Sequence, residues 1–596
     1  MQYTVSEQRG IFILIGVLLA GLLVCLALLA CTPPFSRDAL IHHLQLPKLY
    51  LQHGGIYEIP ELIFSYYPMN LDLLYMGALY LGSDILAKYI HMVFGLGTAL
   101  LLYFHLKKRL SSTYGLLGAL FFLSIPIIVK LSITVYVDLG LIFFSTASLL
   151  LLFHWLETGK QKRYLLLAGL SCGLAIGTKY NGLLVLFLLA LMLPILIIRS
   201  QPQTQKEAGT ALKATIFFCL AALLSTSPWL MRNAIWTGNP IYPLYNGFFN
   251  RSLAVSPADQ QRSTTTEKEV KTNDVKKSSG AAGVLARRYV LYQENIWQLL
   301  LLPVRIFFEG QDNDPRYFDG RLNPFLFLLP LLSFLGIMQE KKQLRLEKTT
   351  LAAFSVFYFL FAFNTGVLRI RYLAPILPFL VILSMYGLNN LEKLAGKYAT
   401  KIGLAKLTWP LTVSLLLLWN VSYISQQFKK IDPFSYITGR LSRDQYLTKQ
   451  IPEYPVMQYA NKNLPDSAKI ICLFLGWRGY YLDRPHLFDA HGNPDLLLSW
   501  LGQPESNVET VLQNLQEQNI THLCVRTDLT AQWLYNRESH QQELWNQLSR
   551  NHLIAVQTHL NYILYQINFR SVPLPSPVFF LFLFLFLRDR LWLFFG

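Results

Sequence analysis

Apolar blocks of similar length recur along this chain, and they constrain its fold more than any other feature. Each is close to the roughly 20 residues that cross a bilayer as an α-helix. The sequence therefore predicts an all-α polytopic membrane protein with about eleven transmembrane helices. The blocks lie at 11–31, 85–104, 113–129, 138–156, 164–178, 182–198, 212–230, 323–338, 349–366, 372–389 and 407–424.

Composition agrees with a membrane protein. Charged residues make up only 15% of the chain and hydrophobic residues 53%, whereas a soluble domain is about 25% charged. The net charge of +17 would suggest a nucleic-acid partner in a soluble protein. Here the basic residues lie in short clusters between apolar blocks, which is typical of cytoplasmic loops. Membrane lipids, and no nucleic acid, are therefore the expected surroundings.

The basic residues are shared unequally between alternate loops. One set of loops, with Arg9, holds 18 Lys and Arg, and the opposite short loops hold 6. Because Lys and Arg favour the cytoplasmic side, the N-terminus is predicted to be cytoplasmic. Residues 32–84, 130–137, 231–322 and everything after 425 are then on the far side. For a bacterial chain this means the inner membrane, with a periplasmic C-terminal domain.

Three segments need separate interpretation. The block at 11–31 is interpreted as a retained first span rather than a signal peptide. The block at 296–308 is short and contains Pro303 and Arg305, so an interfacial helix is predicted; a span there would invert the sidedness of all that follows. Residues 251–283 are polar and aperiodic, which predicts a mobile loop.

The composition changes after the last block. Residues 1–424 form the predicted transmembrane domain, with far-side loops at 32–84 and 231–322, and residues 425–570 a small soluble α/β domain. The apolar tail 571–596 is too short to span and is assigned no function. Strand-like patterns occur at 469–476, 521–528 and 553–567, and helical patterns at 508–519 and 541–550.

Six cysteines are present, without a CxxC spacing, so a zinc site is not expected. Cys472 and Cys524 fall in predicted strands, where two buried free thiols are favoured over a disulfide.

Ionisable residues at a membrane boundary are costly, and therefore mark functional sites. Asp38 follows the first span, and His42, four residues on, would face the same way on a helix. Asp138 begins the fourth span. The remaining candidates also lie in predicted far-side loops: Lys179, Tyr180, Arg232, Asn233, Arg371 and Tyr372.

Two carboxylates and several cations thus converge on one membrane face. This suits an anionic lipid-linked substrate and an acid/base step. Simpler interpretations remain open at this point. Asp38 can cap the following helix, and the cations can be orientation or snorkelling residues. Tyr66, Tyr67 and Tyr372 fit an interfacial aromatic belt.

Five stretches together resemble bacterial C-type glycosyltransferases, which take sugar from a polyprenyl-phosphate donor. The first is the loop RDALIHHLQLPKLYLQHGGIY…SYYPMNLDLLYMGAL, which looks like the first periplasmic loop of that group. The others are YVDLGLIFF, LAGLSCGLAIGTKYNGLL, SPWLMRNAIWTGNPIYPLYN and RYLAPILPFL. They occur in the same order over residues 11–390. Relatives include the protein O-mannosyltransferases and the lipid A aminoarabinose transferase.

The resemblance implies a catalytic carboxylate at Asp38, a second essential acid at Asp138, and inversion at the anomeric carbon. Protein O-mannosyltransferases carry an Asp-Glu pair where this chain has Asp38-Ala39, so that pair assigns neither metal binding nor base chemistry here. No metal ligand set is assigned, and a divalent metal is left open as a cofactor. Asp38 is expected to take the acceptor proton, while Lys179, Arg232 and Arg371 stabilise the leaving phosphate.

Two other classes of protein compete with this interpretation. A transporter or flippase predicts broken helices, paired repeats and mid-membrane charge, whereas the polar residues here gather at one face. A non-catalytic scaffold is the third possibility, with the α/β domain binding a partner. A glycosyltransferase acting on a cell-envelope glycan, lipid or protein is the favoured prediction.

Overall fold

The computed structural model describes residues 5–200, 206–250, 281–363, 368–398, 408–489, 496–503 and 505–570. Most of the loop predicted at 251–283 and the whole tail 571–596 lie outside these residues. The chain divides into two compact units, and within the described residues the second unit starts at Asp444.

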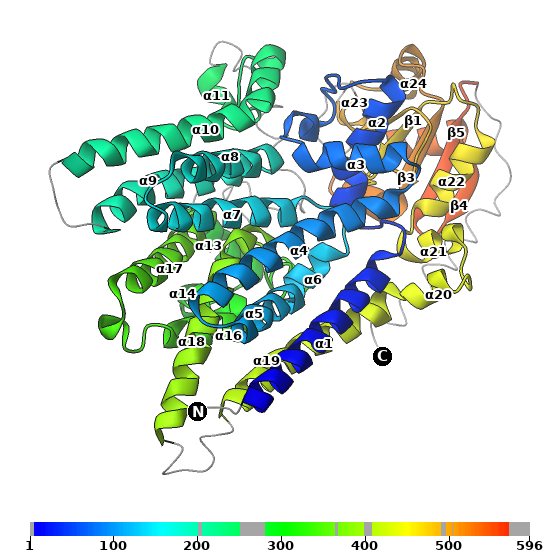
Figure 1. Ribbon diagram of the computed structural model, residues 1–596. Helices are drawn as coiled ribbons and strands as arrows, with labels where there is room; N and C mark the ends of the chain where they lie inside the picture. Colours follow the sequence, from blue (N-terminus) through cyan, green and yellow to red (C-terminus); the bar gives the residue numbers. More distant parts are fainter. Residues whose placement is uncertain are drawn as a thin grey trace. The chain divides into compact units, whose positions relative to one another are not determined.

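The described part of the first unit is almost entirely helical (Figure 1). Its N-terminal half contains α1 (Val5–Ala30), η1 (Ala39–His43), α2 (Gln45–His53), η2 (Ile63–Tyr66), α3 (Asn70–Tyr80), α4 (Asp84–Arg109), α5 (Ser112–Ser124), α6 (Pro126–Ser132), α7 (Asp138–Glu157), α8 (Lys162–Thr178), α9 (Gly182–Ser200) and α10 (Lys206–Thr237). Its remaining elements are α11 (Asn246–Phe249), α13 (Ala281–Tyr292), α14 (Ile296–Leu300), α15 (Leu302–Phe308), α16 (Phe325–Leu332), η5 (Ile337–Gln339), α17 (Lys342–Ala362), η6 (Ile370–Ile376), α18 (Leu377–Tyr398), α19 (Thr408–Ile431) and α20 (Pro433–Ile437).

Six helices in the described residues are long and apolar enough to cross a membrane, and a bent pair, α5 with α6, makes up to seven. The chain is thus a multi-pass membrane protein, as predicted. Two predicted spans form helices shorter than these six. α8 has 17 residues, and α16 has only 8, with Pro330 inside it. The six are Arg9–Ala30, Asp84–Arg109, Asp138–Glu157, Gly182–Ser200, Gly209–Thr237 and Ile370–Gly396.

Close helix packing explains the glycines of the stretch around α8. Gly169 and Gly173 lie four residues apart, on one face of the helix. A Cβ on Gly173 would approach the backbone oxygen of Ala222 in α10 to 2.1 Å. Thr226 of α10 donates to the carbonyl of Gly173 at 2.7 Å. Small residues allow this approach between membrane helices, and so fix α8, whose C-terminal end carries Lys179.

α7 connects the two ends of the helical unit. Its 20 residues span about 30 Å, the thickness of a bilayer core. Asp138 begins the helix and Glu157 ends it. Both acids are in ion pairs, with different partners at the two ends.

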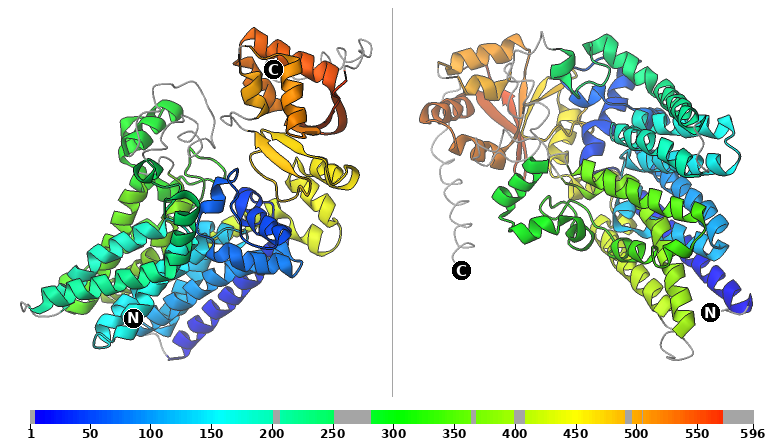
Figure 2. Two further views of the ribbon diagram at one scale, coloured as in Figure 1. Left: turned by 90° about the horizontal axis from the view of Figure 1, so that it is seen from above. Right: turned by 90° about the vertical axis from the view of Figure 1, so that its left-hand side faces the viewer.

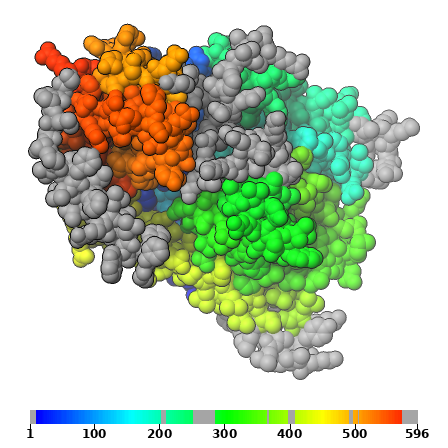
Figure 3. All heavy atoms as spheres, turned by 180° about the vertical axis from the view of Figure 1, so that it is seen from behind, coloured from blue at the N-terminus to red at the C-terminus, as the bar shows by residue number. Residues whose placement is uncertain are grey.

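The segment predicted as a single interfacial helix at 296–308 forms two short helices, α14 and α15. Neither is long enough to span. α14 begins with a capping box, in which Asn295 and Gln298 bond each other's backbone. The segment from α13 to α16 forms a continuous surface, coloured green in Figure 3.

The second unit contains a five-stranded sheet with the order β2-β1-β3-β5-β4. β1 pairs in parallel with β2 and β3, whereas β5 runs antiparallel to β3 and β4. The α/β composition predicted there is confirmed, although β2 was not foreseen. The strands are β1 (Ile470–Leu473), β2 (His486–Asp489), β3 (His522–Arg526), β4 (Leu553–His559) and β5 (Tyr562–Ile567). The helices are α21 (Arg443–Gln450), α22 (Tyr454–Asn463), α23 (Leu497–Leu501), α24 (Val508–Glu517), α25 (Thr527–Tyr535) and α26 (Ser539–His552).

Helices cover both faces of this sheet (Figure 2). Ile470 and Cys472 pack with α22 on one face, whereas Ile471 and Leu473 pack with α24 and α26 on the other. A strand that is buried on both faces has a continuous run of apolar residues. β1 shows this pattern. Cys472 and Cys524 lie opposite each other in β1 and β3, and both are buried free thiols.

Candidate functional site

Asp38 lies at the start of η1, a short helix that follows α1. Its side chain makes no capping hydrogen bond to η1, which removes the helix-cap interpretation. Instead it forms an ion pair with Arg371 of η6, more than 300 residues away in sequence. Arg37, the neighbouring cation in sequence, is exposed.

Asp138 forms a second ion pair at the N-terminal end of α7. Lys179 Nζ lies 2.7 Å from Asp138 Oδ1, and Asp138 is only 2% exposed. Lys179 follows the last residue of α8, so the turn between α8 and α9 delivers the cation. The positive N-terminal end of α7 also favours a carboxylate at this position.

Aromatic rings join the two ion pairs into one cluster. The ring centroid of Tyr372 lies 5.4 Å from Lys179 Nζ and 5.4 Å from Arg371 Cζ. Arg371 also lies over Tyr136, at 5.3 Å. Such cation–π contacts hold the cations in place without neutralising them. Asp38, Asp138, Lys179, Arg371 and Tyr372, all predicted as site residues, are thus brought together.

The charge state of Asp38 is set by its surroundings. Burial alone would raise its pKa, but the charge of Arg371, with a smaller contribution from His42, outweighs burial and holds the pKa well below its usual range. Asp38 is therefore a carboxylate at neutral pH. Its basicity is low as long as Arg371 remains on it.

Two histidines line the same loop. His42 stacks on Phe64, with ring centroids 4.3 Å apart, and its buried Nδ1 has no hydrogen-bond partner among the described residues. Burial lowers the pKa of His42 to about 3 and that of His43 to about 4. Both rings are therefore neutral at pH 7.

A buried pair that sequence reasoning missed lies beside these groups. His43 Nδ1 is 2.8 Å from Asp72 Oδ1, and burial raises the pKa of Asp72 to about 7. Asp72 therefore exchanges a proton near neutral pH, a property common in catalytic carboxyl groups. Asp72 lies in the first-loop stretch that carries the family resemblance. Only its burial, which the sequence does not give, distinguishes it from other acids of that loop.

His91 of α4 was also missed. Its Nε2 accepts a hydrogen bond from the backbone N–H of Leu139 at 3.0 Å. Its Nδ1 therefore carries the proton, and lies 3.0 Å and 2.9 Å from the carbonyl oxygens of Leu131 and Thr134. The ring ties α4 to the loop before α7 and so positions Asp138. A histidine inside an apolar block was the available signal.

The three other predicted residues form a neighbouring cluster. The guanidinium of Arg232 lies between Trp229 and Trp236, 4.8 Å from each ring centroid. Asn233 donates to the hydroxyl of Tyr180 at 2.9 Å.

This cluster fastens the loop after η2 to α10. Arg232 donates to the carbonyl of Tyr67 at 3.1 Å, and Asn233 donates to that of Tyr66 at 2.8 Å. These contacts support the loop, and neither Asp38 nor Asp138 is among the partners of Arg232.

A metal ion does not fit this arrangement. Within the described part of the chain, no group of three or more His, Cys, Asp or Glu residues could hold a metal. Asp38 and Asp138 each already bind a cationic side chain. The cluster therefore offers carboxylates for proton transfer and cations for a phosphate.

The fold and this cluster define a class: a multi-pass membrane protein with an acid–cation cluster at one end of its spans. Residues 59–237 match the family model of dolichyl-phosphate-mannose-protein mannosyltransferases. This match, which includes Asp138 and Lys179, confirms the predicted resemblance to C-type glycosyltransferases. It favours a glycosyltransferase over a transporter. No curated protein sequence matches the chain.

Solved structures share the fold. ArnT from Cupriavidus metallidurans bound to undecaprenyl phosphate is 12% identical, with a TM-score of 0.52, over 94% of this chain and 98% of ArnT. Apo ArnT from the same organism is 12% identical, with a TM-score of 0.51, over 92% of this chain and 97% of ArnT. The oligosaccharyltransferase AglB from Archaeoglobus fulgidus is 10% identical, with a TM-score of 0.49, over 94% of this chain and 75% of AglB. At these identities the ArnT likeness shows the fold.

Proposed function

We propose that this protein is a membrane glycosyltransferase that moves a sugar from a polyprenyl-phosphate donor to a hydroxyl of a cell-envelope glycan, lipid or protein. The observation that carries the proposal is the cluster in which two acid–cation pairs share Tyr372. A transferase of this kind needs a carboxylate for the acceptor proton and cations for the departing phosphate. The family match supports the same reaction.

The donor phosphate is assigned to Arg371 and Lys179. ArnT of the same fold was solved with undecaprenyl phosphate, and we carry that class of lipid over to this chain. Arg371 offers a planar fork of donors suited to phosphate oxygens. Lys179 offers a point charge beside the same Tyr372 ring. His42, with its open Nδ1, is assigned to the sugar hydroxyls.

The proposed reaction is a single displacement at the anomeric carbon. The acceptor O–H gives its proton to Asp38, and the oxygen forms a bond to the anomeric carbon. The bond between that carbon and the phosphate oxygen breaks, and the polyprenyl phosphate leaves with the electron pair. Attack opposite the leaving group inverts the anomeric carbon.

Arg371 couples donor binding to the basicity of Asp38. When a phosphate takes hydrogen bonds from Arg371, the carboxylate of Asp38 loses part of its charge partner. Its pKa then rises toward the usual range, because the charge of Arg371 is what holds it down. The base is therefore weak without a donor and stronger with one.

The finer architecture belongs to this proposal. We assign about eleven spans in residues 1–424 and a periplasmic α/β domain at 425–570, in a bacterial inner membrane with the N-terminus in the cytoplasm. The bias of 18 against 6 basic residues supports this orientation.

Mass spectrometry of cell-envelope glycans and glycoproteins, with and without the gene, tests the proposed function. Loss of one sugar, restored by the wild-type gene but not by an Asp38→Asn gene, is the expected result. Identical glycans in all strains would contradict glycosyl transfer to the envelope.

A further inference from the structure

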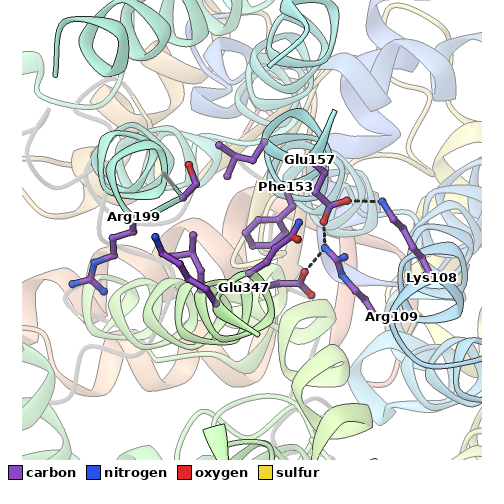
Figure 4. Close-up of a pocket in the computed structure, with 11 residues that line it drawn as sticks. Lys108, Arg109, Phe153, Glu157, Arg199 and Glu347 are labelled. Atoms are coloured by element: carbon purple, nitrogen blue, oxygen red, sulfur yellow. Dashed lines mark hydrogen bonds and ion pairs between the residues drawn. The ribbon is translucent and has the colours of Figure 1, made fainter. Parts of the chain in front are cut away.

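A second charged site lies at the other end of α7, and the proposed function does not use it. The ends of α4, α7 and α9 and the start of α17 enclose a cavity of about 510 Å³ (Figure 4). The first three helices are candidate spans. The cavity therefore opens where spans end, at the end of α7 opposite Asp138.

The carboxylates of this cavity are fully compensated. Arg109 lies between Glu157 and Glu347, 2.5 Å from the latter, and Lys108 reaches Glu157 at 2.5 Å. Glu347 also accepts from His105 at 2.8 Å and from the Tyr386 hydroxyl at 2.6 Å. Neither acid needs a further cation.

Two cations of the lining have no such partner. The lining holds four cationic side chains and two carboxylates, so its net charge is +2. Arg199 and Lys342 supply the excess, and neither is in an ion pair among the residues described. In Figure 4, Arg199 lies on the side of the cavity away from Arg109, and no dashed line reaches it. An anion is the ligand that this charge balance favours.

The surroundings indicate that the anion belongs to a lipid. Phe153, Leu156 and Leu346 give the cavity an apolar wall. The exposed side chains of Leu191, Ile195 and Ile198 continue along α9 toward Arg199. Their spacing puts them on one face of the helix, where acyl chains can lie below a bound headgroup. A free anion would make no contact with this row of apolar side chains.

From these observations we propose that the cavity binds the phosphate headgroup of an anionic membrane lipid through Arg199 and Lys342. The start of α17 contributes Lys342 and Gln343 to the lining, and the positive end of the helix favours an anion there. A bound headgroup would link the ends of α9 and α17. The proposal does not rest on the transferase activity.

Binding of phosphatidylglycerol to the purified full chain tests the proposal, by native mass spectrometry and by thermal unfolding in detergent. The wild-type protein should bind it more tightly than phosphatidylcholine. An Arg199→Gln/Lys342→Gln variant should bind it about tenfold more weakly, because two charge-assisted hydrogen bonds are lost. A Lys107→Gln/Lys162→Gln variant, with the same charge removed from exposed residues outside the cavity lining, should bind as wild type does.

Three results would overturn the proposal. Equal binding of phosphatidylglycerol by wild type and the Arg199/Lys342 variant would place the lipid elsewhere. Equal affinity for phosphatidylcholine would remove the role of charge. Displacement of phosphatidylglycerol by millimolar inorganic phosphate would identify a free-anion site instead. Because binding alone is measured, failure here leaves the transferase proposal untouched.

Discussion

The two ends of α7 carry acids in different surroundings. At the N-terminal end, Asp138 pairs with Lys179 beside a second single pair, Asp38 with Arg371. At the C-terminal end, Glu157 takes Lys108 and Arg109, and Arg109 is shared with Glu347. One end holds one cation for each acid, whereas the other is a closed network.

The difference indicates how each end is used. A carboxylate held by one cation becomes a better base when a substrate phosphate draws that cation away. A carboxylate with several donors is not freed by the loss of one, and breaking such a buried network mainly costs stability. The acids at the N-terminal end therefore suit chemistry, whereas the acids at the C-terminal end suit a structural role.

The first test of this comparison is labelling from one side of the membrane. We expect an all-or-none difference between the two ends of α7. Glu61 is exposed in the segment between α2 and η2, and Gln161 is exposed shortly after α7 ends at Glu157. With cysteine at 61, intact cells should react with a membrane-impermeant thiol reagent; with cysteine at 161 they should react only after permeabilisation. The parent protein controls for its own cysteines. Labelling of both positions from outside would mean that the two ends of α7 do not face different compartments.

Substitution at the chemical end should have the next largest effect. Asp138→Asn removes the charge partner of Lys179, which then no longer holds its position for the donor phosphate. We expect sugar transfer to fall about a hundredfold, the usual size of such effects. Asp84→Asn is the matched control, since Asp84 also begins a candidate span and pairs with Arg443. Equal loss in both variants would show a general structural effect.

Substitution at the structural end should reduce stability instead. Glu347→Gln leaves Arg109 with Glu157 alone and weakens the contact with His105. The expected loss is about 2–3 kcal/mol of unfolding free energy, with turnover per folded molecule nearly unchanged. Thermal unfolding in detergent and a transfer assay on the same sample separate the two. Glu543→Gln, at an exposed residue, should change neither.

The pH dependence of unfolding stability is a further test, at the N-terminal end of α7. Burial raises the pKa of Asp72 to about 7, so the cost of its charge grows from about pH 4 to pH 7. Asp72→Asn keeps a hydrogen-bonding partner for His43 and removes that cost.

The variant should therefore gain stability relative to wild type as the pH rises through this window, by at most about 1.4 kcal/mol per pH unit. Lowering of the His43 pKa to about 4 works in the opposite direction, destabilising wild type as the pH falls below about 6.5. Unfolding temperatures at pH 5 and pH 8 measure the difference, and a constant gap between variant and wild type would contradict the raised pKa of Asp72.

Sequence periodicity predicted the elements better than their ends. The apolar block at 138–156 became α7, because a long apolar run allows only a helix in a bilayer. The block at 323–338 became the eight-residue α16, with Pro330 inside it and the left-handed Gly336 soon after. Strand β2 was missed because its four residues, His486–Asp489, show no clear alternation.

The candidate site was predicted in composition but not in pairing. Loop position and charge selected Asp38, Lys179 and Arg371, since charge at a membrane boundary is costly. Which acid meets which cation depends on helix packing, which joins Asp38 to Arg371 across 333 residues of the chain. The burial of Asp72 depends on the same packing. Sequence also did not give the contacts of Arg232: its guanidinium packs between Trp229 and Trp236 and donates to the loop carbonyl of Tyr67, and its role toward phosphate stays a prediction.

The most direct test of the account is transfer from radiolabelled undecaprenyl-phosphate sugar in membranes, comparing Asp38→Asn with Glu157→Gln at equal amounts of folded protein. Asp38→Asn should lower turnover about a hundredfold and leave donor affinity nearly unchanged, because the lost interaction belongs to the transition state. Glu157→Gln should keep the normal turnover. Normal transfer by Asp38→Asn, or equal loss in both variants, would contradict the assignment of chemistry to one end of α7.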